Sequence, residues 1–351
     1  GMTGYQEMLS DPSFRGQMVV LTYPLAGNYG INADDMESRQ LQLQALIVRE
    51  LCQEPSNWRS QRSLDKQLKL AGIPGIYGID TRALTRHIRQ AGAMMGALSS
   101  TRSAEELLAT LKRNPNYAAI DFVKVVTCGE PYVWEESRGQ PQRIALMDFG
   151  VKFNLLRVLS RAGCEVTVFP CDTRPEDILA FEPEGIVLSP GPGNPALLDY
   201  AIDTTRQLIH EKPVLGVCLG HQLIGMALGG STYKLKFGHR GANHPVMERA
   251  SGVVRVTSQN HGFAPDEAGL AAKGAVVSYV NLNDNTVEGL RHVDLPLLSI
   301  QFHPEASPGP NDSESIVRQF VDLLGSRVWG LGSGEMATVG GPDPRPQTPN
   351  P

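Results

Sequence analysis

The sequence lacks the features of membrane-spanning and nucleic-acid-binding proteins. None of its apolar runs approaches the roughly 18 residues that a membrane-spanning helix needs, and its first residues do not resemble a secretory signal peptide. The net charge is −5, and acidic and basic residues are interspersed, which argues against the basic face of a nucleic-acid-binding domain. We therefore expect neither a membrane nor a nucleic acid as a partner.

Cysteine is also scarce, and no two cysteines form a Cys-x-x-Cys pair. The five positions are Cys52, Cys128, Cys164, Cys171 and Cys218. An odd count in a chain of this length argues against a disulfide framework, and the spacing does not suit a zinc cluster, so no metal site is predicted. These features favour a cytoplasmic location.

The composition that remains is globular, in a chain long enough for two domains. Of 351 residues, 41% are hydrophobic and 20% charged, which suffices for two apolar cores. We predict a smaller mixed α/β domain over residues 1–123, a polar, turn-rich linker over 124–142 and a second domain over 143–329. The Gly/Pro-rich residues 330–351 have little to bury and are expected to form a disordered tail.

The N-terminal domain shows few regular patterns. A short strand ending in proline is expected at 19–24, and helices are expected at 80–89, with Asp80 as N-cap, and at 104–112. The apolar residues between positions 36 and 52 fit either a helix or a strand.

After residue 143, apolar runs typical of buried parallel strands alternate with helical patterns. Strands are predicted at 144–148, 165–169, 186–189 and 214–217, and helices at 154–162, 196–210 and 221–228. This alternation predicts an α/β fold with an open, mostly parallel sheet and flanking helices. In such sheets, active sites lie outside the carboxyl ends of the strands.

One of these strand ends carries the nucleophile-elbow pattern Gly-x-Cys-x-Gly, centred on Cys218. Glycines leave room for a sharp strand-to-helix turn, and the following helix N-terminus stabilises a thiolate. By itself the pattern fits a small buried core cysteine equally well. The other four cysteines lack these flanks and are interpreted as structural.

A thiol nucleophile needs a base, and the base needs a group that orients it. His303 and Glu305 follow another apolar strand, and residues two apart on extended backbone point the same way, so Glu305 can fix the tautomer of His303. The other histidines fit simpler roles: surface positions for His87, His210 and His292, local packing for His221, and loops that could line the site for His239, His244 and His261.

Donors for an oxyanion are also available at the same sheet edge. Residues 189–195 follow a predicted strand and expose backbone N–H groups around Gly191 and Gly193. The N–H of Leu219, directly after the nucleophile, is a second natural donor.

Together, the Cys218 elbow with Gln222, the glycine loop and His303-Pro-Glu305 resemble the triad-type (class I) glutamine amidotransferases, over residues 143–326. The resemblance implies hydrolysis of the glutamine carboxamide through a γ-glutamyl thioester on Cys218. Ammonia then passes to a synthetase partner.

Segments 236–246 and 258–263, together with 2–13, 21–30 and 72–82, resemble the carbamoyl-phosphate synthetase small chain. The resemblance implies a large ATP-dependent subunit as partner, with ATP and Mg²⁺ held there and no cofactor in this chain. The product would serve the pyrimidine and arginine pathways. The implied L-glutamine contacts are Ser13, Gly191, Gly193, Leu219, Gln222, Asn260, Gly262 and Phe263.

Two departures from that family are visible. Strands of the first domain usually precede the segment at 2–13, so the N-terminal sheet is expected to lack its first strands. The oxyanion loop reads Ser-Pro-Gly-Pro-Gly-Asn where Asn-Gly-Pro-Gly-Asp is common, but Gly191 and Gly193 remain.

Three alternatives stay open from the residues alone: another thiol hydrolase such as a cysteine peptidase, the amidotransferase subunit of a different synthetase, and a non-catalytic binding subunit. Gln222 and the His-Pro-Glu pairing count against the peptidase. The N-terminal domain counts against the peptidase and against the amidotransferase subunit of a different synthetase. A non-catalytic subunit would be expected to have lost Cys218, His303 or Glu305.

Overall fold

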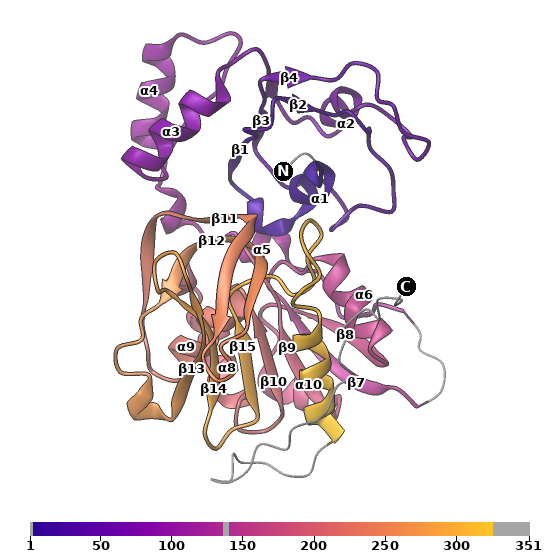
Figure 1. Cartoon of the computed structure of the whole chain (residues 1–351), viewed down its shortest axis with the longest axis vertical. Coiled ribbons are helices and arrows are strands. Elements are labelled where there is room, and N and C mark those ends of the chain that lie inside the picture. The colour runs from indigo at the N-terminus through magenta and orange to yellow at the C-terminus, as the bar shows by residue number, and fades with distance from the viewer. Residues whose placement is uncertain (1–2, 136–139, 326–351) are drawn as a thin grey trace, which may run out of the picture.

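The computed structural model describes residues 3–135 and 140–325, so the predicted tail at 330–351 lies outside the described residues. A smaller N-terminal part lies against one end of a larger part that contains the main sheet (Figure 1). Within the described ranges, no helix is both long and apolar enough to cross a membrane.

The larger part is built on a ten-stranded sheet in the order β12-β11-β13-β14-β15-β10-β9-β7-β8-β6. The five strands from β15 to β8 pair in parallel, and antiparallel strands extend the sheet on both sides. The predicted α/β fold with an open sheet is confirmed. The strands are β6 (Tyr132–Val133), β7 (Gln142–Asp148), β8 (Cys164–Pro170), β9 (Gly185–Leu188), β10 (Val214–Val217), β11 (Thr232–Glu248), β12 (Val254–Pro265), β13 (Ala275–Asn281), β14 (Val287–His292) and β15 (Leu297–Ile300).

Helices cover both faces of the parallel strands. Because side chains alternate across a strand, Ile144 and Leu146 of β7 pack on one apolar cluster, and Ala145 and Met147 pack on the other. The first cluster includes α6 (Phe153–Arg161) and α10 (Ser315–Gly325). The second includes α7 (Pro175–Ala180), α8 (Asp199–Leu208) and α9 (Leu219–Ala227), and the short 3-10 helices of this part are η3 (Pro195–Leu197) and η4 (Ala271–Lys273).

The N-terminal part has its own small apolar cluster, which includes Leu9, Leu46 and Leu64. Its strands form a three-stranded parallel sheet, β1-β3-β5, and a two-stranded pair, β2-β4. The elements are α1 (Tyr5–Ser10), η1 (Pro12–Phe14), β1 (Met18–Val20), β2 (Leu25–Ala26), β3 (Ala45–Ile47), β4 (Glu50–Leu51), α2 (Leu64–Leu70), β5 (Gly75–Ile76), α3 (Thr81–Ala91), α4 (Ala104–Arg113), η2 (Tyr117–Ala119) and α5 (Val123–Val126).

The helices predicted for this part are confirmed, whereas the strand predicted at 19–24 is shorter: β1 covers Met18–Val20, and residues 21–24 form no strand. The helices predicted at 80–89 and 104–112 are α3 and α4, and the Asp80 side chain accepts a hydrogen bond from Ala83 N, as an N-cap does. The ambiguous segment at 36–52 forms the short strands β3 and β4 rather than a helix.

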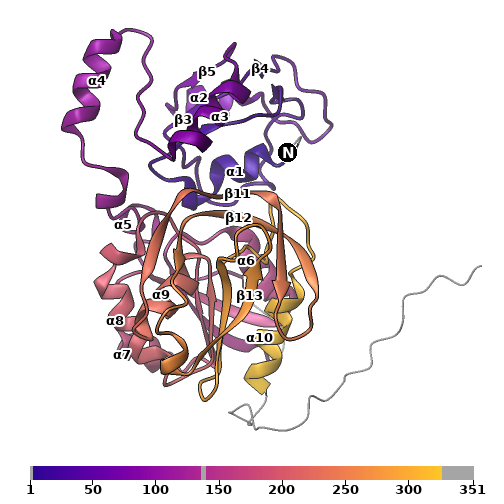
Figure 2. The same cartoon turned by 60° about the vertical axis from the view of Figure 1, so that its left-hand side comes forward.

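The stretch at 124–142 is more structured than a turn-rich linker. Its described residues include most of α5 and all of β6, and β6 pairs antiparallel with β8 at the edge of the main sheet. The domain boundaries themselves stay a prediction. The N-terminal part and the main sheet meet near α1, which lies directly above β11 and β12 in Figure 2 and above and to the right of them in Figure 1.

Candidate active site

Cys218 lies between β10 and α9 in a strained backbone conformation, with φ 53° and ψ −101°. Such a conformation persists only where the surroundings hold it. A Cβ atom on Gly216 would lie 2.8 Å from Gly220 O, and one on Gly220 would lie 2.2 Å from Leu188 O. Both glycines are therefore required, and the predicted nucleophile elbow is present.

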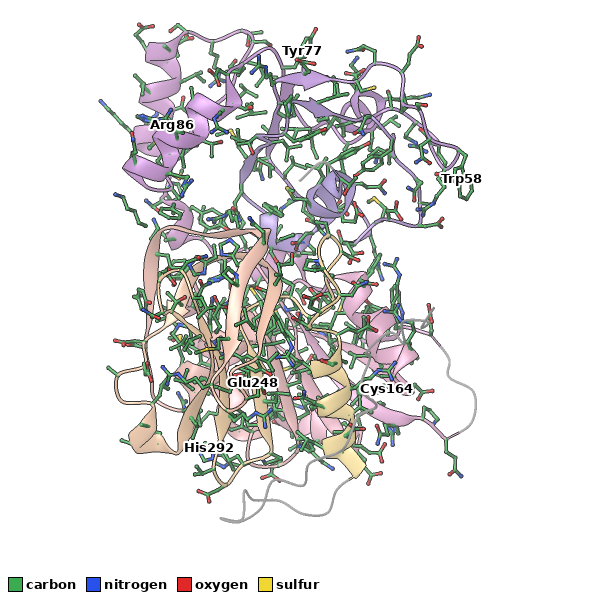
Figure 3. The ribbon with its side chains drawn as sticks, in the orientation of Figure 1. Trp58, Tyr77, Arg86, Cys164, Glu248 and His292 are labelled. Atoms are coloured by element: carbon green, nitrogen blue, oxygen red, sulfur yellow. The ribbon has the colours of Figure 1, made fainter. Side chains whose placement is uncertain are left out.

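The elbow places the Cys218 sulfur at the carboxyl end of the parallel strands and at the N-terminus of α9. The side chain is buried, and the backbone N–H donates to Ile300 O of β15 at 2.8 Å. The other cysteines lack this setting; Cys164, for example, is the buried first residue of β8, on the right of the larger part in Figure 3.

His303 and Glu305 lie side by side, with 2.6 Å between Nδ1 and Oε1. The backbone at 304 and 305 forms a turn rather than the extended strand that we expected, and the two side chains meet across this turn. Both are buried. Because the carboxylate accepts a hydrogen bond from Nδ1, the Nε2 atom is left unprotonated in the neutral ring.

Charge inside this buried site determines its protonation. Burial alone would lower the pKa of His303, but the charge of Glu305 and the thiol of Cys218 raise it to about 10. Burial would raise the pKa of Glu305, but Lys152 and His303 lower it to about 2. The Nε2 atom makes no well-aligned hydrogen bond to the described residues. Hydrogen bonds between catalytic groups are often poorly aligned without substrate and tighten when substrate binds.

A pocket opens beside the Cys218 sulfur, between the N-terminal part and the main sheet. Seven of the eight predicted glutamine contacts line it, namely Ser13, Gly191, Gly193, Gln222, Asn260, Gly262 and Phe263. The eighth, Leu219, is the first residue of α9, where N–H groups have no intrahelical partner. The Ser13 hydroxyl is buried and has no partner among the described residues, so it is available to a ligand.

The walls of the pocket are held by hydrogen bonds from neighbouring elements. The Gln222 side-chain amide donates to Phe263 O at 2.8 Å and to Gln301 Oε1 at 3.0 Å. Asn260 Nδ2 lies 3.4 Å from Asp11 Oδ2, which ties β12 to the N-terminal part. A Cβ atom on Gly191 would lie 2.2 Å from Phe149 O, so this loop position accepts only glycine.

Four further residues line the pocket that the sequence did not single out: Gln17, Tyr117, Pro192 and Arg240. His261, which the sequence placed among the histidines that could line the site, lines it as well. Tyr117 and Gln17 come from the N-terminal part and are hydrogen-bonded to each other at 3.1 Å. No local pattern marks them, because the fold brings them to the site from distant positions. Arg240 lies within segment 236–246, which resembles the carbamoyl-phosphate synthetase small chain. That resemblance is the sequence signal that could have identified Arg240 as a pocket residue.

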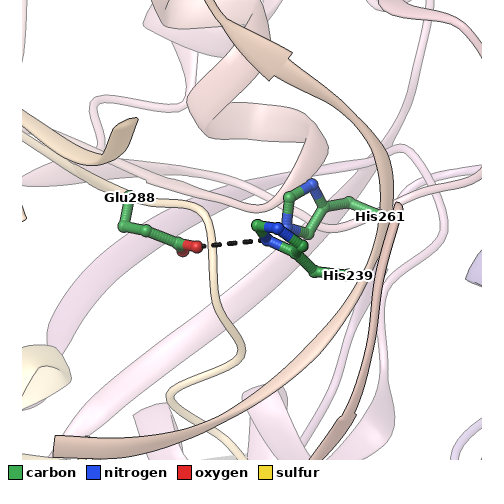
Figure 4. Close-up of side chains that lie close together, drawn as sticks. All are labelled: His239, His261 and Glu288. Carbon is green, nitrogen blue, oxygen red and sulfur yellow. Dashed lines mark ion pairs between the residues drawn. The ribbon is translucent and has the colours of Figure 1, made fainter. Parts of the chain in front are cut away.

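The three histidines expected in loops lie instead on long strands, His239 and His244 on β11 and His261 on β12. Figure 4 shows His239, His261 and Glu288 together, with 3.4 Å between His239 Nδ1 and Glu288 Oε1. The candidate ligand atoms of the three lie within 4.8 Å of one another. His239 Nε2 also bonds Asp284 Oδ2 at 2.8 Å.

These histidines are already engaged in a hydrogen-bonded network at the wall of the pocket, which His261 lines. The ring nitrogens of His261 lie 2.7 Å from Phe263 O and 2.7 Å from Gln259 Oε1, and Gln259 donates to Glu288. We therefore interpret the cluster of His239, His261 and Glu288 as a hydrogen-bonded group that holds residues 259–263 in position.

The remaining histidines are not among the residues that line the pocket. His221 is buried on α9, where its Nδ1 lies 2.8 Å from Ser299 Oγ, and burial lowers its pKa to about 3. This confirms local packing. His87 on α3 and His210 after α8 are exposed, and His292 lies half-exposed at the end of β14.

The arrangement has the parts that acyl transfer requires: a thiol at a strained elbow, a base oriented by a carboxylate, and backbone N–H groups at the same sheet edge. It can attack an amide or ester carbonyl and hydrolyse the resulting thioester.

Comparisons with known proteins narrow this chemistry. Residues 145–323 match the family "Glutamine amidotransferase class-I", and residues 1–98 match "Carbamoyl-phosphate synthase small chain, CPSase domain". The carbamoyl phosphate synthase small chain of Syntrophotalea carbinolica is 50% identical over 92% of this chain and 89% of its own length. That of Nostoc sp. is 49% identical, over 92% and 87%. The pyrimidine-specific small chain of Bacillus subtilis is 48% identical, over 92% and 87%. This chain therefore belongs to the carbamoyl phosphate synthase small-chain family.

Proposed function

We propose that this chain hydrolyses the side-chain amide of L-glutamine and supplies the ammonia for carbamoyl phosphate synthesis. The observation that carries the proposal is the buried Cys218 elbow with the His303–Glu305 pair close to its thiol. Relatives about half identical over nine-tenths of the chain are named carbamoyl phosphate synthase small chains, which supports the choice of amide and product.

The Cys218 thiolate attacks the amide carbon of glutamine and forms a tetrahedral oxyanion. The N–H groups of Gly191 and Leu219 stabilise this charge. His303, held by Glu305, gives its proton to the departing nitrogen, so ammonia leaves and a γ-glutamyl thioester remains. His303 then takes a proton from water, the hydroxide attacks the thioester, and glutamate and the free thiol are released.

The pocket geometry supports glutamine contacts on both sides of the thiol. Ser13 approaches from the N-terminal part with a free hydroxyl, and Gly193, Gln222 and residues 260–263 form the other walls. The substrate would therefore be enclosed between the two parts of the chain.

A larger ATP-dependent subunit is the proposed partner, with ATP and Mg²⁺ bound there. Two large aromatic side chains of the N-terminal part, Trp58 and Tyr77, are 92% and 64% exposed (Figure 3). Exposed aromatic surface of this kind is typical of protein interfaces. The product would enter pyrimidine synthesis, as the names of two relatives indicate, and arginine synthesis. We place the activity in the cytoplasm.

The Cys218→Ser variant tests the proposal. In the complex with its partner, we expect glutamine-dependent synthesis to fall at least about 1,000-fold, because a serine hydroxyl is a far weaker nucleophile here. Ammonia-dependent synthesis should be unchanged. Cys52→Ser, which alters a partly exposed cysteine of the N-terminal part, is the matched control. Glutamine turnover at the normal rate by Cys218→Ser would disprove the assignment.

A further inference from the structure

Helix α6 begins without a capping side chain of its own. Its N-cap residue, Lys152, makes no side-chain cap hydrogen bond. The cap comes instead from Glu37 of the N-terminal part, whose backbone oxygen accepts from Phe153 N at 2.9 Å and whose Oε2 accepts from Asn154 N at 2.9 Å. First-turn N–H groups lack partners within their helix, so one distant residue satisfies two of them.

The same helical turn holds Glu305 at two points. Lys152 Nζ lies 3.3 Å from Glu305 Oε1 and also donates to the backbone oxygen of Ala306. The Asn154 side-chain amide donates to the backbone oxygen of Glu305. The position of Glu305, and through it the orientation of His303, therefore depends on where this turn lies.

The connection from Glu37 through Lys152 to Glu305 is made of buried charged groups. Glu37, Lys152 and Glu305 are only 1%, 2% and 1% exposed. Burial alone would lower the pKa of Lys152, but Glu305, Glu37 and Asp11 raise it. Glu37 Oε1 is also paired with Arg157 Nη1 at 3.2 Å, one turn further along α6. Removing one member of a buried charged group leaves the others uncompensated.

We propose that Glu37 is a positioning residue for the glutaminase reaction, which it serves by capping the turn of α6 that clamps Glu305. The N-terminal part thus contributes to the base as well as to the pocket. This inference rests on the proposed function. Glu37 lies outside the set of residues that line the pocket, so its effect falls on the chemical step rather than on glutamine binding.

The test is a kinetic cycle in the full chain with Glu37→Ala, Glu305→Gln and the double variant. Glu37→Ala should lower kcat for glutamine hydrolysis by up to about 100-fold, the effect of a displacement near 1 Å, with KM changed less than about twofold. In the Glu305→Gln background, the same change should have little further effect, because the clamp then holds an uncharged side chain that no longer fixes the tautomer of His303. Glu37→Gln keeps an acceptor for Asn154 N and should retain more activity.

Asp34→Asn is the matched control, since its carboxylate is on the same segment but exposed, and among the described residues it forms an ion pair with Arg59. The proposal would be overturned if Glu37→Ala lowered kcat by the same factor in the wild-type and Glu305→Gln backgrounds. A folded Glu37→Ala variant with unchanged kcat would overturn it as well. If Glu37→Ala does not fold, the cycle is run with Glu37→Gln. The rate of Cys218 alkylation across pH, followed by mass spectrometry, separates the two proposals. A wild type that does not hydrolyse glutamine contradicts the function, whereas a pH dependence of alkylation that Glu37→Ala leaves unaltered contradicts the positioning role.

Discussion

The Nδ1 atom of His303 lies 2.6 Å from Oε1 of Glu305, in a setting where both side chains are buried. A short contact between an imidazole and a carboxylate in a low dielectric fixes the tautomer and favours the imidazolium. This pairing therefore determines both the direction in which the His303 imidazole points and the pH range over which it is protonated.

Glu305→Gln should lower kcat/KM for glutamine by about tenfold or more and shift its pH profile. The charge of Glu305 raises the pKa of His303, so removing that charge lowers this pKa. In the proposed mechanism the reactive form pairs a protonated His303 with the Cys218 thiolate, so the alkaline limb of the profile moves to lower pH. Steady-state rates across pH measure the shift. Glu165→Gln, a half-buried change on β8, should leave the profile in place, and an unshifted limb in Glu305→Gln would refute the coupling.

Ser13→Ala should weaken glutamine binding without affecting stability. The Ser13 hydroxyl is buried in the pocket and has no partner among the described residues. A neutral hydrogen bond to a ligand contributes about 0.5–1.5 kcal/mol, which corresponds to a rise in KM of roughly 2- to 12-fold. Steady-state kinetics and thermal unfolding measure the two quantities. An unchanged KM would remove Ser13 from the glutamine contacts.

The elements that carry Cys218, His303 and Glu305 could be predicted from sequence for a physical reason. At Gly216 and Gly220, any side chain would meet backbone atoms, so the local residues alone indicate the elbow. His303 and Glu305 are neighbours in sequence, and a short turn suffices to join them. Strand and helix periodicities then place both at one sheet edge.

What sequence could not predict depends on long-range contacts. Glu37 and Lys152 are 115 positions apart, and neither has a local signature, so their roles appear only in the assembled fold. The β11–β12 hairpin was missed because its register shifts near Gly238 and Gly241 interrupt the regular alternation of a strand. His239, His244 and His261 were therefore expected in loops.

Gly220→Ala should destabilise the protein and abolish activity together. The new methyl group would lie 2.2 Å from Leu188 O on the neighbouring strand, and overpacking of this kind costs about 1–3 kcal/mol. The shift would also move the thiol at the adjacent elbow. Gly129→Ala is the control, because a Cβ atom there has no neighbour within 4 Å. Urea unfolding and glutamine hydrolysis give the two readouts. A Gly220→Ala protein with wild-type stability and activity would contradict the close contact between α9 and β9.

Glu37 should make the stability of the protein fall as pH rises toward neutrality, relative to Glu37→Gln. Burial is the largest influence on its carboxyl group and raises the pKa from 4.5 to about 7, against the opposing charges of Lys152 and Arg157 and with a contribution from Glu305. The folded state therefore binds the proton more tightly than the unfolded state. Stability is highest below the unfolded pKa and is lost as pH rises through the folded pKa.

Each pH unit between these two pKa values changes the free energy of unfolding by about 1.4 kcal/mol, so the total is on the order of 3 kcal/mol. Urea unfolding of wild type and Glu37→Gln from pH 5 to pH 8 measures the difference. We expect the advantage of wild type to shrink with rising pH and to level off above the folded pKa. Asp34→Asn, which removes an exposed carboxylate, should run parallel to wild type. Parallel curves for Glu37→Gln as well would show that Glu37 is ionised throughout, because only a group that gains a proton on folding produces this slope.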